Sequence, residues 1–299
     1  MLARLQKFIT LGLLTFVAAW ALAAFQWGRP GWAAGGLAIV LAGYTGFMAF
    51  EFIVMAALHR DDPAPRPRFG QMVRAWWAEV TTSPFVFCWQ QPFRSHVHPD
   101  YLPAESAARA VVLVHGYVCN RGFWNAWMPR LRARGVPHVA VNLEPVFGSI
   151  HGYADVIDAA VRRAQSVTGR PVVIVAHSMG GLAVRAWLTR EGAAERVHRV
   201  VTIGTPHHGT WTARFGTTDN AVEMRSGSAL LGFLAEREPR GLHGRFTCFY
   251  SHCDNIVHPA STGALEGADN RHVAGAAHVD MVRHPAVYDE VVRLATQGT

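Results

Sequence analysis

The stretch Val172–Gly181 (VVIVAHSMGG) constrains the fold of this chain more than any other. Apolar and mostly β-branched residues lead into His-Ser, and residues 182–188 then return to the apolar spacing of a helix. The pattern predicts a strand, a sharp turn with Ser178 at its tip, and a helix. The motif is A-x-S-x-G. A crowded turn of this kind needs small residues two positions before and after the serine, which Ala176 and Gly180 supply.

From residue 110 onwards, short apolar runs alternate with amphipathic ones. The predicted strands are 111–114, 138–141, 172–176, 197–203, 245–250 and 271–273, and the predicted helices are 123–134, 153–167, 179–189 and 285–295. Strands that are apolar throughout are buried on both faces, which is typical of a parallel sheet. The sequence therefore predicts an α/β fold with a mostly parallel sheet and helices on both of its faces.

Two long uncharged segments precede this region. Residues 8–25 and 31–50 contain no charge, and the second apolar run continues past Glu51 to Leu58. A membrane-spanning helix needs ~20 apolar residues, so both segments qualify. Tryptophans near the intervening turn suit a membrane interface, and glycines in the second segment would let two helices pack closely; these residues are Trp20, Trp27, Trp32, Gly35, Gly36, Gly43 and Gly46. We predict an N-terminal transmembrane helical hairpin.

The alternative is a cleaved signal peptide followed by one span, because Arg4 and Lys7 form a charged start and Ala21-Leu22-Ala23 resembles a cleavage site. Positive charge flanks the apolar region at both ends, whereas the turn holds only Arg29. The flanking residues are Arg4, Lys7, Arg60, Arg66, Arg68 and Arg74. The positive-inside rule then predicts that both ends of a hairpin face the cytoplasm.

Composition shifts divide the chain into three parts. Residues 1–60 are the expected hairpin, 61–109 are a linker and a segment leading into the next domain, and 110–299 are the expected catalytic domain. The proline-rich run Asp61–Arg68 is the boundary. Within the last part, residues 206–244 separate two core strands. We interpret them as a cap or lid of short helices, with simple packing over the sheet as the alternative.

Charge and cysteine content exclude other classes. The net charge is +7, but it comes from scattered arginines, and no motif points to nucleic acid. The 4 cysteines contain no C-x-x-C pair, and free thiols are the simpler interpretation, although a Cys248–Cys253 link stays open. No acidic cluster suggests a calcium site, so neither a metal nor a cofactor is expected.

A serine hydroxyl becomes nucleophilic only beside a base that an acid orients. Asp254 follows the predicted strand 245–250, and His278 lies in a loop of small residues before the last helix. Both follow the carboxyl ends of predicted parallel strands, where sites in such sheets form. The chain order is thus Ser178, Asp254, His278.

With 16 histidines in the chain, competitors must be weighed. His207 and His208 precede any late acid and are expected to line the site, whereas His258 and His284 are interpreted as structural or solvated. Asp280 lies too close in sequence to His278 to orient it easily. The other candidate acids are Asp155, Asp158, Asp219 and Asp269, which fall on a helix or in loops.

Stabilising a developing oxyanion requires backbone N–H donors. We expect one from Met179, directly after the serine, and a second from Tyr117, in the loop after the first core strand. Further residues are expected to contact or line the substrate site: His115, Gly116, His177 and His208.

Several motifs occur together in order: VVLVHGY, VAHSMGG, TIGTPHHGT, EMRSGS, D-x-x-V at Asp254 and HVDM at His278. From about Val111 to Val291 this set resembles bacterial lipases and esterases of the α/β-hydrolase superfamily. The resemblance implies that fold and an acyl-enzyme mechanism on carboxylic esters, in which Ser178 attacks, His278 moves the proton and Asp254 orients it. It does not extend to the hairpin.

The resulting hypothesis is a serine carboxylic ester hydrolase that acts on hydrophobic acyl or lipid esters at a membrane. The alternatives are an acyltransferase or thioesterase with the same triad, and a catalytically silent membrane-bound interaction module. The presence of all three triad residues argues against the last. The expected location is the bacterial inner membrane with the catalytic domain facing the cytoplasm, or the periplasm if only one uncleaved segment crosses. Oligomeric state is not predicted.

Overall fold

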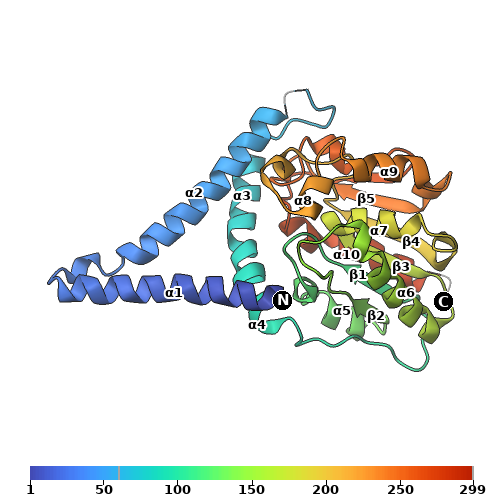
Figure 1. The fold of residues 1–299 in the computed structure, drawn as a ribbon, viewed down its shortest axis with the longest axis horizontal. Coiled ribbons are helices and arrows are strands. Elements are labelled where there is room, and N and C mark those ends of the chain that lie inside the picture. Colours follow the sequence, from blue (N-terminus) through green and yellow to red (C-terminus); the bar gives the residue numbers. More distant parts are fainter. Residues whose placement is uncertain (60, 298–299) are drawn as a thin grey trace.

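The computed structural model describes residues 1–59 and 61–297 (Figure 1). Arg60, which the charge argument for topology uses, and Gly298 and Thr299, at the end of the expected catalytic domain, lie outside the described residues. An α/β domain forms one side of the molecule, and two long N-terminal helices project away from it.

A parallel six-stranded sheet in the order β2-β1-β3-β4-β5-β6 forms the centre of the α/β domain. Its strands are β1 (Val111–Val114), β2 (His138–Ala140), β3 (Val172–His177), β4 (Val197–Ile203), β5 (Phe246–Tyr250) and β6 (Asp269–His272). The predicted strands are confirmed with ends that differ by no more than two residues. The strand that carries Ser178 at its end, β3, has a partner on each side.

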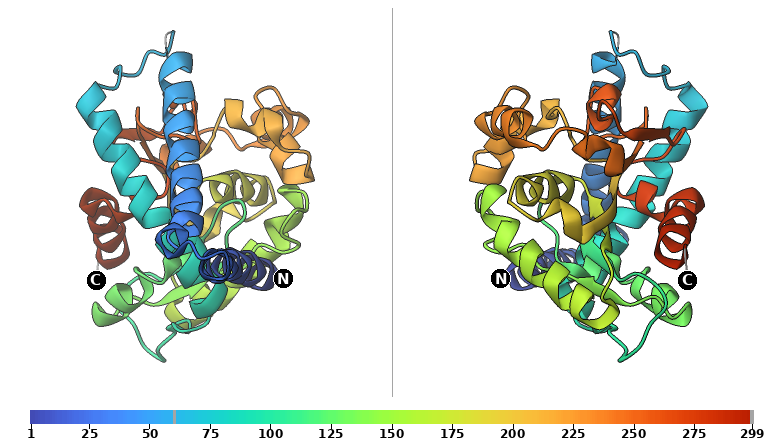
Figure 2. Two further views of the ribbon diagram at one scale, coloured as in Figure 1. Left: turned by 90° about the vertical axis from the view of Figure 1, so that its left-hand side faces the viewer. Right: turned by 90° about the vertical axis from the view of Figure 1, so that its right-hand side faces the viewer.

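The sheet is buried on both faces because alternate side chains of each apolar strand enter different cores. Val112 and Ile174 pack in one core with Leu182 of the helix after Ser178. Leu113 and Val173 point the other way, into a second core that the last helix closes. Figure 2 shows α6 and α10 on opposite sides of the domain.

The helices are α1 (Leu2–Gln26), α2 (Gly35–Leu58), α3 (Phe69–Pro84), α4 (Gln91–Arg94), α5 (Met128–Ala133), α6 (Ala154–Thr168), α7 (Met179–Leu188), α8 (Asp219–Glu223), α9 (Ala229–Arg237) and α10 (Pro285–Thr296). A π-helical turn (Phe85–Gln90) joins α3 to α4. Short 3₁₀ turns occur at Pro30–Trp32, Arg121–Trp124, His151–Tyr153, Ala194–Arg196, Trp211–Phe215, Leu242–Arg245, Ala260–Gly263 and Asp280–Arg283.

The single helix predicted over 123–134 is wrong. A 3₁₀ turn ends at Trp124, and α5 begins only at Met128. Pro129 explains the break, because proline lacks an N–H to continue an earlier helix but fits the first turn of a new one.

The N-terminal helices α1 and α2 form a hairpin whose tip is remote from the α/β domain (Figure 1). Both are long and apolar enough to cross a membrane, with mean hydropathy of 2.1 and 1.9, and only 6% of each apolar window is buried. The indole of Trp20 contacts Gly35 and Gly36 near the tip, where an added Cβ would come within 2.9 Å of it. Gly43 and Gly46 have no such neighbour, so of the four glycines predicted to allow close packing only Gly35 and Gly36, near the tip, do so.

At its base the hairpin packs with α3 against the α/β domain. Phe52 and Met55 of α2 and Ala75 of α3 form a small apolar core with Cys253 and Ala277. Those last two residues directly precede Asp254 and His278 in the chain. The N-terminal helices therefore pack on the two loops from which the predicted acid and base emerge.

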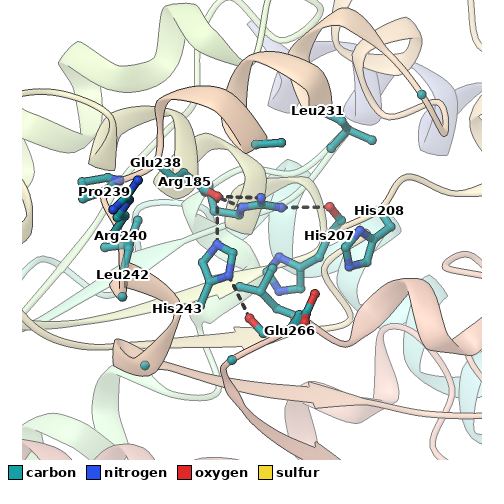
Figure 3. Close-up of a pocket in the computed structure, with 16 residues that line it drawn as sticks. Arg185, His207, His208, Leu231, Glu238, Pro239, Arg240, Leu242, His243 and Glu266 are labelled. Atoms are coloured by element: carbon teal, nitrogen blue, oxygen red, sulfur yellow. Dashed lines mark hydrogen bonds and ion pairs between the residues drawn. The ribbon is translucent and has the colours of Figure 1, made fainter.

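The insertion 206–244 contains α8 and α9, which are short helices of the kind predicted for it. A buried ion pair fastens it to α7: the Arg185 guanidinium donates to both carboxylate oxygens of Glu238 at 2.7 and 2.9 Å and to the His207 carbonyl oxygen at 2.8 Å (Figure 3). Both charged side chains are 5% exposed. His243 also contacts Glu238, at 2.8 Å.

We predict that Arg185→Leu lowers the free energy of unfolding by about 3–5 kcal/mol, because it leaves the buried Glu238 carboxylate without its main partner. Denaturant unfolding in detergent, followed by tryptophan fluorescence, measures the change. Arg237→Leu, at an exposed position of α9, is the matched control and should change stability by less than about 0.5 kcal/mol. Equal effects of the two substitutions would contradict the anchoring role.

Candidate active site

Ser178 occupies a strained turn between β3 and α7. Its φ is 54° and its ψ is −131°, a backbone conformation that non-glycine residues rarely adopt. The two glycines that follow allow this turn to pack tightly. A Cβ on Gly180 would lie 2.5 Å from the His115 carbonyl oxygen, and one on Gly181 would lie 2.2 Å from the Thr205 hydroxyl oxygen. The strand, turn and helix predicted around Ser178 are thus present.

Asp254 and His278 form a buried pair. Asp254 follows β5 and His278 lies after β6, and His278 Nδ1 is 2.9 Å from Asp254 Oδ2. The other carboxylate oxygen accepts the backbone N–H groups of Ile256 and Val257 at 2.9 and 2.7 Å. Because the carboxylate accepts the proton of Nδ1, the Nε2 atom of a neutral His278 ring is the acceptor.

The charge around His278 favours its protonated form. Burial lowers the pKa of His278, but the charge of Asp254 and the hydrogen bond to it outweigh burial, and nearby Glu79 acts in the same direction. The pKa of His278 is consequently raised above its ordinary value. A base of this kind takes up a proton readily, and it is neutral only at a pH above that raised pKa.

The loop after β1 lies directly against Ser178. A Cβ on Gly116 would come within 2.8 Å of the Ser178 Cβ, so only glycine fits without displacement. Val118, two residues on, also has a positive φ of 52°. The predicted oxyanion donors, Tyr117 and Met179, belong to this loop and to the first turn of α7, so both flank the serine.

His115 holds this loop in place. Its Nε2 accepts the Leu143 N–H at 3.0 Å, so Nδ1 carries the proton and donates to the Gly116 carbonyl oxygen at 3.0 Å. Burial lowers the pKa of His115 to about 4, which keeps the ring neutral. The Tyr117 hydroxyl group is 3.1 Å from the Thr218 hydroxyl group, which links the loop to the insertion.

His177 contacts the backbone of His278, the predicted base. Its ring stacks on Phe123 with centroids 4.5 Å apart, and Nε2 donates to the His278 carbonyl oxygen at 3.1 Å. Burial and the neighbouring His278 lower the pKa of His177 well below its ordinary value, so this ring is neutral as well.

Ser178 and His278 line one cavity of about 440 Å³. Of the predicted substrate-contact residues, His177 lines this cavity, whereas His115 and Gly116 are not among its lining residues. Tyr117 also lines it. The other walls come from α1, α2 and α3 and the turn after α3, through residues that include Leu13, Leu41 and Glu79. Among the described residues, those lining this cavity include none from 206–244.

His208, predicted to contact substrate, lies elsewhere. It lines a separate cavity of about 610 Å³ beneath the insertion, together with Arg185, Glu238 and His243 (Figure 3). Ser178, Asp254 and His278 are not among the residues of that cavity. The insertion therefore lines this second cavity, and its Thr218 contacts Tyr117 in the loop beside Ser178.

Two carboxylates that sequence reasoning missed support the base. Glu79 of α3 is 2% exposed and accepts the N–H groups of Val279 and Asp280 at 3.1–3.2 Å. Glu51 of α2, which directly follows the uncharged segment 31–50, accepts from the Asn255 amide at 2.8 Å. Asn255 Oδ1 in turn accepts the His278 N–H at 3.3 Å. A lone acid among the apolar residues of an amphipathic segment was the only signal for Glu79.

Burial raises the pKa of Glu79 from 4.5 to about 7, although His278 and the two backbone N–H groups oppose this shift. A folded-state pKa above the unfolded value means that Glu79 stabilises the fold fully below pH ~4.5 and that this contribution is lost as the pH rises through about 7. Glu79 and His278 therefore titrate as a coupled pair.

We predict that Glu79→Gln shifts the acid limb of kcat/KM to lower pH by about 0.5–1 unit, because it removes a negative charge that raises the pKa of His278. The pH profile of short-chain ester hydrolysis measures the shift. Glu105→Gln, in an exposed loop, is the matched control and should leave the limb in place. An acid limb that is unchanged or moves to higher pH in Glu79→Gln would contradict this coupling.

A parallel sheet, a strained serine turn after one of its central strands and an Asp–His pair on later loops are together typical of α/β-hydrolases. Comparison with known protein families gives the same class. The profile of the Alpha/beta hydrolase family matches residues 111–293, which is more than half of the chain. The chain belongs to this family.

Solved structures with similar folds include two lipases. The mature form of lipase BlEst2 from Bacillus licheniformis aligns with a TM-score of 0.56 and 20% identity, over 67% of this chain and 94% of that one. Lipase B from Aspergillus fumigatus aligns with a TM-score of 0.54 and 16% identity, over 65% of this chain and 55% of that one. At these identities the likeness establishes the fold. A search of curated proteins found no match.

Proposed function

We propose that this hydrolase cleaves carboxylic esters with hydrophobic acyl groups through a covalent acyl-enzyme on Ser178. The observation that carries the proposal is the buried pair of His278 and Asp254, with His278 lining the same apolar cavity as the strained Ser178. The folds of two lipases are also similar to this one.

In the proposed mechanism, Ser178 Oγ attacks the ester carbonyl carbon while His278 Nε2 takes the hydroxyl proton. Asp254 holds the ring in the required tautomer and stabilises its positive charge. The Tyr117 and Met179 N–H groups stabilise the oxyanion. When the tetrahedral intermediate collapses, His278 gives its proton to the departing alcohol. Water, activated by the same imidazole, then releases the carboxylic acid. Transfer to an alcohol or thiol in place of water would make the protein an acyltransferase.

We predict that an alkyl fluorophosphonate probe labels the wild-type protein at Ser178 and that Ser178→Ala abolishes both labelling and hydrolysis of p-nitrophenyl esters. Asp254→Asn should lower kcat by about 10⁴-fold, because the wrong histidine tautomer then faces the serine. Peptide mapping and initial rates measure these effects. Undiminished hydrolysis in Ser178→Ala, or no labelling of the wild type, would reject the proposed chemistry.

The hairpin is proposed to cross a membrane. Its exposed side chains are large and apolar on both helices, and these include Phe8, Leu14, Phe25, Leu37 and Phe47. A helix from the core of a soluble protein would be buried, whereas these are not. Leu2 and Gln6 of α1 are buried, and Gln6 donates to the Val118 carbonyl oxygen at 3.3 Å. Removal of α1 as a signal peptide would break this contact beside the site, so an uncleaved hairpin is favoured.

We predict that the catalytic domain faces the cytoplasm of an inner membrane, because positive charges flank the base of the hairpin and only Arg29 lies at its tip. In a bacterial host, a fluorescent reporter fused after Arg68 should be bright and an alkaline phosphatase fused there should be inactive. The same reporters fused at Gly28 should give the opposite pattern. An active phosphatase after Arg68 would place the domain in the periplasm.

A further inference from the structure

We propose that the hairpin forms the acyl-binding wall of the active site, so that a lipid ester reaches Ser178 sideways from the bilayer between α1 and α2. The proposal rests on the ester hydrolase function above and assigns its substrate to the lipids of the surrounding membrane. It also gives the hairpin a role in selecting substrate, which a simple anchor would not have.

The cavity beside Ser178 extends into the hairpin. Its walls include Leu13 of α1 and Val40, Leu41 and Met48 of α2. In Figure 1, α1 and α2 diverge from the tip towards the α/β domain, and α3 crosses between their wide ends. The cavity thus occupies space bordered by all three helices and by the serine turn.

The depth of the cavity suits a chain-like ligand. Along α2, the residues that line the cavity run from Val40 to Met48, which corresponds to roughly 12 Å along the helix axis. A volume of about 440 Å³ falls within the range of sites that enclose small-molecule ligands.

The polar groups that line this cavity come mostly from outside the hairpin. Ser178, His278, Asn255 and Glu79 come from the α/β domain and α3, whereas the hairpin contributes the apolar side chains Leu13, Val40, Leu41 and Met48. The hairpin also contributes Tyr44, whose hydroxyl group is occupied by its hydrogen bond to the Val80 carbonyl oxygen. This polarity matches an ester with its carbonyl at the serine and its hydrocarbon chain extending between the helices. The 206–244 insertion contributes no lining residue among those described, so the hairpin takes the place that the lid was expected to fill.

Specific contacts hold these walls against the site. The Tyr44 hydroxyl group donates to the Val80 carbonyl oxygen at 3.3 Å, and the Trp76 indole donates to the Thr45 carbonyl oxygen at 3.2 Å, which fastens α2 to α3. Gln6 joins α1 to the loop of Val118. The base of α1 and the middle of α2 are therefore held by contacts with the loop of Val118 and with α3, respectively.

The outer surface of the hairpin favours entry from lipid over entry from water. Leu13 and Leu41 line the cavity yet are 42% and 52% exposed, so the wall they form also borders the surroundings of the hairpin. In a bilayer those surroundings are hydrocarbon. An acyl chain could pass between the helices without crossing water, which would otherwise solvate the chain unfavourably.

The test blocks the apolar end of the cavity in the full-length protein, reconstituted in phosphatidylcholine vesicles. Leu41→Trp and Leu13→Trp place a bulky ring in the space proposed for the chain. Ile39→Trp is the matched control, because Ile39 is as exposed as Leu41, at 52%, but does not line the cavity. The substrates are p-nitrophenyl acetate, which needs only the base of the cavity, and p-nitrophenyl palmitate.

We expect both cavity variants to lose at least about tenfold in kcat/KM for the palmitate, because displacement of a bound chain misplaces the ester. The ratio of palmitate to acetate kcat/KM should therefore fall in both cavity variants, whereas both activities of Ile39→Trp should stay within about twofold of wild type. Unchanged palmitate hydrolysis in both cavity variants, alongside acetate hydrolysis that Ser178→Ala abolishes, would overturn this proposal and leave the ester hydrolase function intact.

A binding measurement decides the proposal without catalysis. Ser178→Ala protein is placed in vesicles that contain a phosphatidylcholine with a photoactivatable diazirine in one acyl chain. We expect crosslinks on residues 117–119, which line the cavity inside the α/β domain, and their loss when Leu41→Trp is added but not when Ile39→Trp is added. Absence of crosslinks at 117–119 would overturn the proposal. Failure of the wild-type protein to react with the fluorophosphonate probe would instead contradict the proposed hydrolase function.

Discussion

The site depends first on the backbone of Ser178, which is held in a conformation that costs about 1–3 kcal/mol for a non-glycine residue. Its neighbours determine that conformation from both sides. The Ser178 N–H donates to the Ile203 carbonyl oxygen at 2.9 Å, and the Thr205 hydroxyl group donates to the Ser178 carbonyl oxygen at 2.9 Å. Gly116 and Gly181 allow the surrounding chain to approach. The central position of β3 thus fixes where the hydroxyl group lies.

His278, the proposed base, is held by other elements than those that hold Ser178. Asp254 and His278 emerge from loops beyond β5 and β6, and these loops are braced by N-terminal helices as well as by the sheet. Glu79 of α3 accepts two N–H groups directly after His278, and Glu51 of α2 reaches the His278 backbone through Asn255. The sheet positions Ser178, the proposed nucleophile, and the helices from the first third of the chain help to position His278, its proposed base. A shift of α2 or α3 would consequently alter the geometry between the two.

Local pattern explains which parts could be predicted. Short-range signals in the sequence predict the apolar strands, the turn at Ser178 and the positions of Asp254 and His278 after strands. The structure brings Asp254 and His278 into contact. The break at Pro129 is also local and was readable from the sequence. Glu79 was not, because its partners lie 200 residues away and only the tertiary path of α3 brings them together. For the same reason, sequence could not place His208 in the separate cavity under the insertion.

The family match begins at residue 111, yet several walls of the Ser178 cavity lie before it, including Leu13, Leu41 and Glu79. The proposed catalytic residues Ser178, Asp254 and His278 therefore belong to the family core, whereas the preceding helices form part of the cavity beside Ser178. In a bilayer this division has an energetic consequence. Lipid tails are as apolar as leucine, so a chain that leaves the bilayer for this cavity gains little hydrophobic free energy. For the proposed lipid ester, discrimination among lipids would then come from the shape of the space between α1 and α2, and from how well the polar residues beside Ser178 hold the ester group.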